Sequence, residues 1–189
     1  MLSAESIISK MTWATMDCIE KKRIHKRYRI KELNKTLVYQ RTSKEAKLLC
    51  KAKLIGLHVP TVYFVTPDTI FMEYISGLTM QQVIAAGQYD QDLMTTIGEI
   101  IGILHNNDIV HGDLSPMNII IHDKQPYLID FGLSFTSHTI EDFAVDLVAF
   151  EKVIGNDLLF NYILDGYYSS CKQNISKRID QVRLRGRKK

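Results

Sequence analysis

The pattern of apolar and polar residues predicts strands mainly in the first 76 residues and in one later hairpin. Residues 1–20 alternate weakly and carry β-branched and aromatic side chains, which predicts one or two short strands. Residues 59–77 contain two apolar runs joined by a Pro-Asp turn, which is typical of a strand hairpin. The apolar runs at 119–121 and 127–129 flank a polar turn at 122–126 and predict a second hairpin.

Apolar residues recur at helical spacing in several other stretches. One predicted helix begins at Arg41 and ends near Gly56, a residue that suits a C-terminal cap. A short helix is expected from Thr79 to about Gly87, and the clearest helical pattern covers residues 92–106. A helix is expected after Glu141, and another over roughly residues 157–170. The residues expected to face inward are Leu93, Ile97, Ile100, Ile101 and Leu104 in the clearest helix, and Val145, Val148, Ala149 and Val153 in the helix after Glu141.

This order of elements indicates an α+β fold with two lobes. Residues 1–76 combine the early strands with one main helix, whereas residues 77–180 are mostly helical. Ser76-Gly77 is a short connection that suits a hinge between the lobes. Residues 181–189 form a basic C-terminal tail, which on its own reads as a disordered, solvated end.

Composition excludes several classes of protein. The chain is 46% hydrophobic and 24% charged, which is ordinary for a soluble globular protein. No apolar run approaches the roughly 18 residues of a membrane span, and the N-terminus lacks the features of a signal peptide. Cys18, Cys50 and Cys171 are widely spaced and form no Cys-x-x-Cys pair. They fit reduced thiols of a cytoplasmic or nuclear protein rather than a disulfide framework or a zinc site.

The net charge of +3 is distributed unevenly. Seven of the eleven residues from Lys21 to Lys31 are Lys or Arg, and so are five of the last seven residues. One interpretation of the first cluster is a positive surface for nucleic acid or an acidic partner. The other is a solvated face, and composition alone does not choose between them.

Three polar residues form the strongest chemical signal in the chain. Asp113 follows His-Gly, Asn118 comes five residues later, and Asp130 precedes Phe-Gly. In protein kinases, the first Asp of such a set orients the nucleophile, while the Asn and the second Asp hold the magnesium ions on ATP. The predicted hairpin would bring Asn118 and Asp130 to the same end. Three turn residues could match by chance, but their order and spacing make a phosphoryl-transfer site the better interpretation.

Residues of the N-terminal lobe offer a less specific match to the same chemistry. Lys21 could end a strand where kinases carry their phosphate-pairing lysine, although Lys22 could do the same. Glu45 is the acidic residue of the first predicted helix and could form an ion pair with Lys21. It could equally belong to a capping box with Thr42, which the sequence alone slightly favours.

Nucleotide contacts from the rest of this lobe are expected to be sparse. There is no glycine before Gly56, so the usual glycine-rich phosphate loop is absent and residues 3–6 are the only short-side-chain turn in its place. The backbone at Glu73 and Ile75 would suit pairing with a purine edge. The alternative is a simple edge hairpin.

Across nearly its full length the chain resembles the small atypical kinase/ATPase subunit family of the KEOPS (or EKC) complex, which is related to the RIO kinases. The basic ending is the most specific feature, because generic kinases have nothing comparable. The motifs that carry the resemblance are Lys26-x-Tyr28-Arg29, Arg41-Thr42-x-x-Glu45-Ala46, Met72-Glu73-Tyr74-Ile75-x-Gly77, His111-Gly112-Asp113-Leu114-Ser115-x-x-Asn118, Ile129-Asp130-Phe131-Gly132-Leu133-Ser134, Glu141-Asp142-x-Ala144-Val145-Asp146-Leu147 and Val182-Arg183-Leu184-Arg185-Gly186-Arg187-Lys188.

The resemblance implies a minimal bilobal, protein-kinase-like fold of the RIO-related type. It implies that Lys21 and Glu45 form an ion pair, and that Asp113, Asn118 and Asp130 form a site for ATP and Mg²⁺. The activity implied is ATP hydrolysis that supports threonylcarbamoyladenosine modification of tRNA beside the anticodon, with Ser/Thr phosphorylation also attributed to the family.

The resemblance also implies partners. The threonylcarbamoyl-transferase subunit would bind the C-terminal lobe, a small subunit would bind the N-terminal lobe, and tRNA would be met through the complex. No membrane association is implied. A cytoplasmic and nuclear protein is expected, and in fungi the complex is associated with telomeres and transcription.

The sequence departs from the family pattern in three places. Ser3 stands where the family usually has Gly, the N-terminus is short, and Ile30 stands where His is common. The segment after Asp-Phe-Gly also lacks Ala-Pro-Glu, so no platform for a protein substrate is evident and water is a plausible phosphoryl acceptor. The alternatives are a stand-alone protein Ser/Thr kinase, a small-molecule phosphotransferase and a non-catalytic scaffold of the complex.

Overall fold

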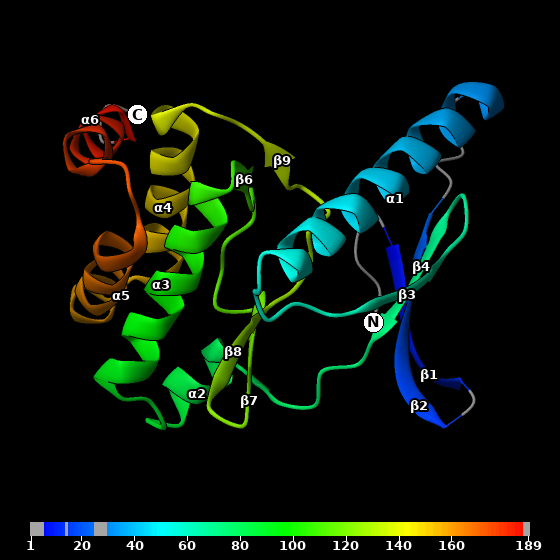
Figure 1. Cartoon of the computed structure of the whole chain (residues 1–189), viewed down its shortest axis with the longest axis horizontal. Helices are drawn as coiled ribbons and strands as arrows, with labels where there is room; N and C mark the ends of the chain where they lie inside the picture. Colours follow the sequence, from blue (N-terminus) through cyan, green and yellow to red (C-terminus); the bar gives the residue numbers. More distant parts are fainter. Residues whose placement is uncertain (1–5, 14, 25–29, 187–189) are drawn as a thin grey trace. The chain divides into compact units, whose positions relative to one another are not determined.

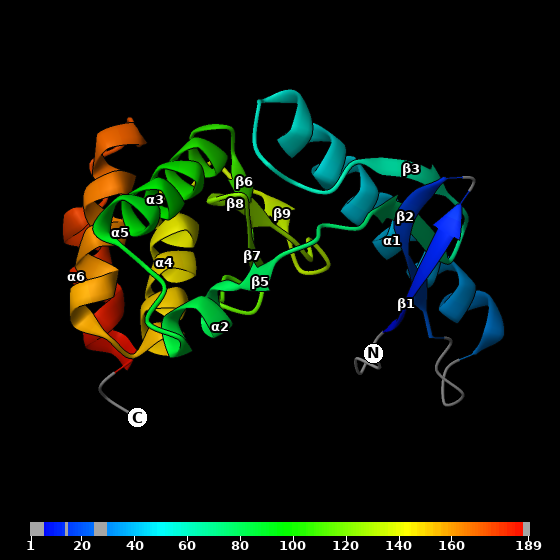
Figure 2. The same ribbon diagram turned by 90° about the horizontal axis from the view of Figure 1, so that it is seen from below.

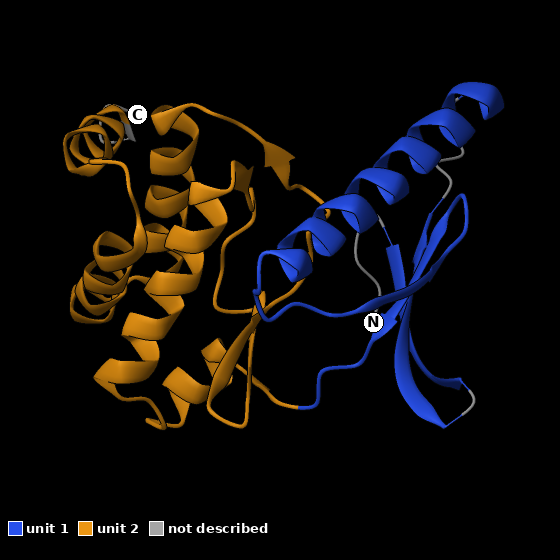
Figure 3. Cartoon of the chain, viewed as in Figure 1, with its two compact units in different colours: residues 1–76 blue, residues 77–189 orange. Residues whose placement is uncertain are grey.

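The computed structural model describes residues 6–13, 15–24 and 30–186 (Figure 1). The chain divides into two compact units, residues 1–76 and residues 77–189, which are coloured separately in Figure 3. We call them the N-terminal unit and the C-terminal unit, and each is described by itself. The structure combines sheets and helices and is of the α+β class.

An antiparallel four-stranded sheet with the order β1-β2-β4-β3 forms the N-terminal unit together with one helix. The strands are β1 (Ser6–Trp13), β2 (Met16–Arg23), β3 (Val62–Val65) and β4 (Thr69–Glu73). Strands β1 and β2 account for the strands predicted in residues 1–20, and β3 and β4 form the hairpin predicted in residues 59–77. Buried apolar side chains of β4, such as Ile70 and Met72, contribute to the core of this unit.

Helix α1 (Lys31–Leu54) is ten residues longer at its start than the helix predicted from Arg41. It packs against β3 and β4, and Figures 1 and 2 both show it running along the sheet. The prediction was wrong because the inner face of this helix is partly polar, so the apolar periodicity is interrupted. The buried residues of α1 are Asn34, Val38, Thr42, Glu45, Ala46, Leu48, Leu49 and Ala52.

Two small sheets organise the start of the C-terminal unit. The first has the order β5-β7-β8 and consists of β5 (Leu78–Thr79), β7 (Ile119–His122) and β8 (Gln125–Leu128). The turn of its hairpin is shorter than expected, because Gln125 and Pro126 belong to the strand. Strands β6 (Ile109–Val110) and β9 (Phe135–Thr136) form the second sheet.

The other elements of the C-terminal unit are helices, most of which begin at a side-chain cap. They are α2 (Met80–Ala85), α3 (Gln91–Asn106), α4 (Ile140–Ile154), α5 (Asp157–Ser170) and α6 (Ser176–Gly186). The four predicted helices of this region are confirmed. The cap of α3 is Asp90, which accepts a hydrogen bond from Leu93 N, and a capping box formed by Thr79 and Gln82 starts α2.

Helices α3 and α5 pack closely because each has a glycine that lies against the backbone of the other helix. A Cβ atom on Gly98 would lie 1.9 Å from the carbonyl oxygen of Ile163, and one on Gly166 would lie 1.9 Å from that of Thr95. No side chain fits at these distances. The close packing of the two helices, visible in Figure 2, therefore depends on these two residues.

The predicted inward face of α4 was wrong in phase. Val145 and Val153 are exposed and only Val148 of the named valines is buried, whereas Phe143, Leu147 and Phe150 form the inner face. The aromatic residues decide the orientation because they bury more apolar surface than valine does.

The basic C-terminal segment is helical rather than disordered as far as residue 186. Helix α6 packs against α4, with Ile179 buried, and Arg183 forms a two-pronged ion pair with Glu151. Arg185 pairs with Glu141, the residue that also pairs with Arg178. Residues 187–189 lie outside the described residues. The first part of the predicted tail is thus an integral part of the C-terminal unit.

Within the described residues, no helix is both long enough and apolar enough to cross a membrane. The three cysteines are free thiols.

Candidate functional site

Strand β2 directs two cations toward the same side. Lys21 and Arg23 are buried, whereas Lys22 between them is exposed, as the two-residue alternation of a strand requires. Of the two lysines considered from sequence, Lys21 is therefore the one enclosed by the fold. Because two of the first three cations are buried, the basic cluster from Lys21 to Lys31 is not a continuous surface; residues 25–29 of it lie outside the described residues.

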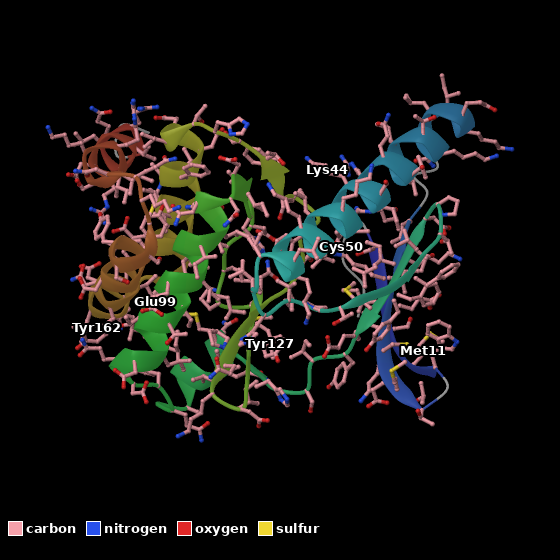
Figure 4. The ribbon with its side chains drawn as sticks, in the orientation of Figure 1. Met11, Lys44, Cys50, Glu99, Tyr127 and Tyr162 are labelled. Carbon is pink, nitrogen blue, oxygen red and sulfur yellow. The ribbon has the colours of Figure 1, made fainter. Side chains whose placement is uncertain are left out.

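Glu45 of α1 forms ion pairs with both cations. Lys21 Nζ lies 2.6 Å from Glu45 Oε1, and Arg23 Nη2 lies 2.5 Å from Glu45 Oε2. The capping-box interpretation is wrong, because Thr42 lies in the middle of α1 and its hydroxyl donates to Val38 O. Lys44 and Cys50, which are labelled in Figure 4, lie on other faces of the helix and are exposed.

Arg23 was missed as a partner of Glu45 by sequence reasoning. The signal was present, since positions 21 and 23 of a strand share a face. It was hidden because Arg23 stands in a run of basic residues that suggested a surface.

The loop between β6 and β7 presents Asp113 to solvent. The side-chain nitrogen of Asn118 donates to the backbone oxygen of Asp113 at 2.9 Å and to its carboxylate Oδ2 at 3.0 Å. These two bonds fix the direction of the amide. Its Oδ1, the better metal ligand, accepts no hydrogen bond from the described residues.

The hairpin β7–β8 links Asn118 to Asp130. Ile129 N donates to Asn118 O at 3.0 Å, so the residue before β7 and the residues after β8 are held together, as the sequence predicted. Asp130 has a left-handed backbone conformation with φ of 61°, which is uncommon for a residue other than glycine. Its Oδ1 accepts a hydrogen bond from Gly132 N at 3.1 Å, which offsets part of that strain.

A buried carboxylate holds the start of the loop that carries Asp113. Asp146 of α4 accepts hydrogen bonds from His111 N and Gly112 N, both at 2.9 Å, through its two oxygens. It also lies 3.2 Å from His105 Nε2, and His105 Nδ1 lies 3.0 Å from the hydroxyl of Tyr167. Since burial raises the pKa of Tyr167, this hydroxyl keeps its proton. The position of Asp113 is thereby tied to α3, α4 and α5.

The sequence offered no geometric signal for this role of Asp146. It lies 35 residues after His111 and was noted only as part of a family motif. Only the packing of α4 on the loop brings the two together.

His111 is completely buried beside Phe131, with ring centroids 4.9 Å apart. Its Nε2 donates to the carbonyl oxygen of Ile129 at 3.1 Å. Burial lowers the pKa of His111 and outweighs the opposite effect of nearby carboxylates, of which Asp146 is the largest. The imidazole is therefore neutral and serves as a packed support rather than as a proton donor to substrate.

The predicted purine contacts involve the segment after β4. The Glu73 carboxylate accepts hydrogen bonds from Thr61 N and Oγ1, and Glu73 N donates to Thr61 O. Ile75 is buried, but its backbone makes no hydrogen bond with the described residues. Of residues 3–6, suggested in place of a phosphate loop, residues 3–5 lie outside the described residues and Ser6 is the first residue of β1.

The residues around Asp130 suit a magnesium ion bound together with a phosphate. No cluster of three or more His, Cys, Asp or Glu side chains that could hold a metal by themselves occurs in the part of the chain that the structure describes. Mg²⁺ on a nucleotide does not need one, because it keeps waters and takes phosphate oxygens as ligands. One carboxylate and one amide oxygen with a fixed direction, as at Asp130 and Asn118, are enough.

The chain is similar to several known proteins. The family model described as the RIO domain matches residues 8–145. The EKC/KEOPS complex subunit BUD32 of Encephalitozoon cuniculi is 39% identical over 189 residues, covering 98% of this chain and 93% of that protein. The subunit of the same name from Dictyostelium discoideum is 35% identical, covering 92% of this chain and 76% of that protein.

A longer archaeal protein is also similar. The probable bifunctional tRNA threonylcarbamoyladenosine biosynthesis protein of Methanosphaera stadtmanae is 35% identical to this chain. The match covers 97% of this chain but only 35% of that protein.

Among solved structures, the Rio2 kinase from Chaetomium thermophilum in complex with ADP, Mg²⁺ and phosphoaspartate superposes with a TM-score of 0.66 at 18% identity. The match covers 98% of this chain and 64% of that one, and it establishes the kinase-like fold. Taken with the match to the RIO model and to full-length relatives, these findings show that the chain belongs to the RIO domain family, in the group of EKC/KEOPS complex BUD32 subunits.

Proposed function

We propose that this chain is the ATP-dependent kinase or ATPase subunit of an EKC/KEOPS complex and supports threonylcarbamoyladenosine modification of tRNA. The observation that carries the proposal is the arrangement of Asp113, Asn118 and Asp130 at one end of a hairpin. The names of the full-length relatives supply the complex, and that of the archaeal relative supplies the tRNA reaction.

The roles of the residues follow from their chemistry. Asn118 Oδ1 and the Asp130 carboxylate would hold Mg²⁺, which neutralises charge on the phosphates when bound. Asp113 is exposed, and one of its oxygens is held by Asn118, so its carboxylate can orient the hydroxyl or water that attacks phosphorus. Lys21, held by Glu45, would pair with phosphate oxygens, and the backbone of Glu73 and Ile75 would meet the purine.

Water is the phosphoryl acceptor that we favour. The segment from Gly132 to Thr139 is short and is fastened by β9 and by Ser134, whose hydroxyl donates to His111 O at 2.7 Å. It leaves no long activation segment of the kind on which a peptide substrate docks. Phosphorylation of a protein Ser or Thr is the second candidate, since the same carboxylate would orient a hydroxyl.

The longer archaeal relatives support a stable partner. In the relative from Methanosphaera stadtmanae, the region that matches this chain makes up about a third of one polypeptide that is named as bifunctional. A subunit of a complex and a fused domain are two ways of keeping the same activities together. We infer that the partner is the threonylcarbamoyl-transferase subunit, bound through the C-terminal unit, with a small subunit on the N-terminal unit and tRNA met through the complex. Such a complex would work in the cytoplasm and the nucleus.

ATP turnover by the purified chain tests the proposal. We expect phosphate release that increases when the partner subunit is added and that disappears in Asp130→Ala. The matched control is Asp165→Ala, which removes an exposed carboxylate from α5 and should leave the turnover of the isolated chain unchanged. A folded wild-type protein that releases no phosphate, alone or with its partner, would contradict the enzymatic proposal.

A scaffold without catalysis is the remaining alternative. The double variant Asp113→Ala, Asp130→Ala separates the two, because it removes the proposed catalytic carboxylates without changing the helical core. If the complex still modifies tRNA at the wild-type rate with this variant, the chain acts as a scaffold. Loss of modification while the complex still assembles supports the enzyme.

A further inference from the structure

Ser134 contributes a buried hydroxyl to the segment that follows Asp130. Its side chain is buried, and its Oγ donates a hydrogen bond to the backbone oxygen of His111 at 2.7 Å. The N–H of Ser134 donates to Phe131 O at 3.1 Å, which closes a turn directly after Asp130. The hydroxyl therefore joins two segments that are 23 residues apart in the sequence.

His111 is bonded to this segment on both sides of Asp130. Its ring Nε2 donates to Ile129 O at 3.1 Å, one residue before Asp130, and its backbone oxygen accepts the bond from Ser134, four residues after Asp130. Because His111 and Ser134 are both buried, water cannot readily replace the bond between them. The two bonds together restrain the segment that carries Asp130.

The bond from Ser134 also acts on the loop that carries Asp113. His111 lies two residues before Asp113, and Asp146 accepts hydrogen bonds from His111 N and Gly112 N, both at 2.9 Å. Asp146 thus holds two amides of this loop, whereas Ser134 holds a carbonyl group of it. Asp146 alone would fix the loop to α4 but not to the segment that carries the proposed metal ligand.

The loop and the segment also touch next to Ser134. Gly112 has a left-handed backbone with φ of 78°, and a Cβ atom on it would lie 2.6 Å from the backbone oxygen of Leu133. No side chain fits there without a shift of the backbone. A displacement of Leu133 would therefore be transmitted to Gly112, the residue directly before Asp113.

We propose that Ser134 is a positioning residue for phosphoryl transfer: its hydroxyl fastens the loop of Asp113 to the segment of Asp130. The inference rests on the proposed function, in which Asp113 orients the attacking oxygen and Asp130 holds Mg²⁺. The two carboxylates must keep a defined separation, because a displacement of about 1 Å can lower a rate by about 100-fold. Ser134 acts through these segments and not by contact with the nucleotide.

The division of its effect between kcat and nucleotide binding tests this role. Ser134→Ala removes the hydroxyl and leaves the backbone unchanged. We expect kcat for ATP hydrolysis to fall by about tenfold, while the dissociation constant of Mg-ATP, measured by calorimetry, changes by less than about twofold. The residues proposed to bind the nucleotide in the N-terminal unit are the same in both proteins. Ser134→Cys, whose thiol is a weaker donor of similar shape, should recover part of kcat.

Ser137→Ala is the matched control. Ser137 is a second buried serine of the same segment, but its hydroxyl donates to Asp142 of α4 and not to the loop of Asp113. We expect both alanine variants to lower the thermal midpoint, and only Ser134→Ala to lower kcat. A wild-type kcat in Ser134→Ala, or an equal loss of kcat in the two variants, would show that the Ser134 hydroxyl has a structural role only and would overturn the inference.

Amide exchange of the chain without nucleotide separates this inference from the proposed function. We expect the amides of Gly112 and Asp113 to exchange about tenfold faster in Ser134→Ala than in wild type, and at the wild-type rate in Ser137→Ala. Unchanged exchange in Ser134→Ala, in a protein whose wild type turns over ATP, would overturn the inference alone. A wild type that neither binds nor hydrolyses ATP would overturn the proposed function, and the inference with it.

Discussion

At the scale of single residues, neutral and charged side chains are kept in separate roles around the catalytic loop. His111 is neutral and buried, and it supports the loop from inside through its bond to Ile129 O. Asp146 is buried and acts as a hydrogen-bond acceptor for the backbone. Asp113, which lies between them in the sequence, is exposed and can meet a substrate. Burial thus decides which carboxylate is structural and which is chemical.

The buried imidazole makes stability depend on pH in a defined direction. Burial lowers the pKa of His111 below its ordinary value of 6.5, so the unfolded chain takes up a proton there before the folded chain does. The contribution of this group is complete above pH 6.5 and is lost as the pH falls from there toward the lowered pKa. We expect the free energy of unfolding, measured with urea, to fall between about pH 6.5 and pH 5 in wild type and to be flatter in His111→Phe.

The partly exposed His122 provides the control for this measurement. Its side chain is 40% exposed, so its replacement by Gln removes an imidazole but not a buried one, and the dependence on pH should stay close to that of wild type. Equal slopes for wild type and His111→Phe would show that the buried imidazole does not control acid stability.

Short motifs predicted part of the site, and packing supplied the rest. Asp113, Asn118 and Asp130 could be proposed from the sequence because the chemistry suggested for them depends on spacing within 18 residues. The ion pair of Lys21 with Glu45 followed only from the family resemblance, since the residues alone slightly favoured a cap. Arg23 and Asp146 act through tertiary contacts over 22 and 34 or 35 residues, and no local pattern marks such contacts.

At the scale of elements, helices were predicted well where one face is apolar and poorly where the inner face is mixed. Helix α5 was predicted at its observed bounds, because its inner face consists mainly of aliphatic and aromatic residues. The first ten residues of α1 were missed because Asn34, one of their two buried residues, is polar, so their inner face shows no apolar periodicity. In α4 the valines led to a wrong prediction of the buried face. A helix with two apolar faces does not reveal from its sequence which of them is buried.

The contact between α3 and α5 gives a prediction at this scale. Alanine normally stabilises a helix relative to glycine by about 1 kcal/mol, but the added methyl group at Gly98 or Gly166 would meet a backbone carbonyl. We expect each of Gly98→Ala and Gly166→Ala to lower the free energy of unfolding by about 2–3 kcal/mol, measured with urea.

Gly102 of the same helix serves as the internal comparison. A methyl group there would first meet the hydroxyl of Ser170, a side chain that can rotate away. Gly102→Ala should therefore cost clearly less than Gly98→Ala. Equal or higher stability of Gly98→Ala would mean that the two helices can separate without loss, contrary to the close packing described above.

At the scale of the whole molecule, the residues that we propose for the nucleotide come from both compact units. Lys21 and Glu45 belong to the N-terminal unit, and Asp113, Asn118 and Asp130 belong to the C-terminal unit. The division after Ser76 falls at the small residues that suggested a hinge in the sequence. The division into two units follows from the order of strands and helices along the chain. Errors in the length of α1 and in the inward face of α4 therefore did not affect its prediction.

Ligand binding should be visible in the stability of the entire chain. A ligand that binds only the folded state at 100 times its dissociation constant adds about 2.7 kcal/mol. We therefore expect Mg-ATP at that concentration to raise the thermal midpoint by about 5–10 °C. Chelation of Mg²⁺, or the variant Asp130→Ala, should remove most of this increase. An increase that persists without Mg²⁺ and in Asp130→Ala would place the nucleotide elsewhere on the protein.

The anchoring of the catalytic loop by Asp146 has a consequence for dynamics. The amide protons of His111 and Gly112 can exchange with solvent only when their bonds to this carboxylate open, and opening them would leave the buried carboxylate with His105 as its remaining partner among the described residues. A loop with little regular structure should therefore exchange as slowly as the helices around it and belong to the same cooperative folding unit. In this protein, substitutions that loosen α4 or α5 would then weaken the proposed ATP turnover without touching any residue proposed to meet the nucleotide.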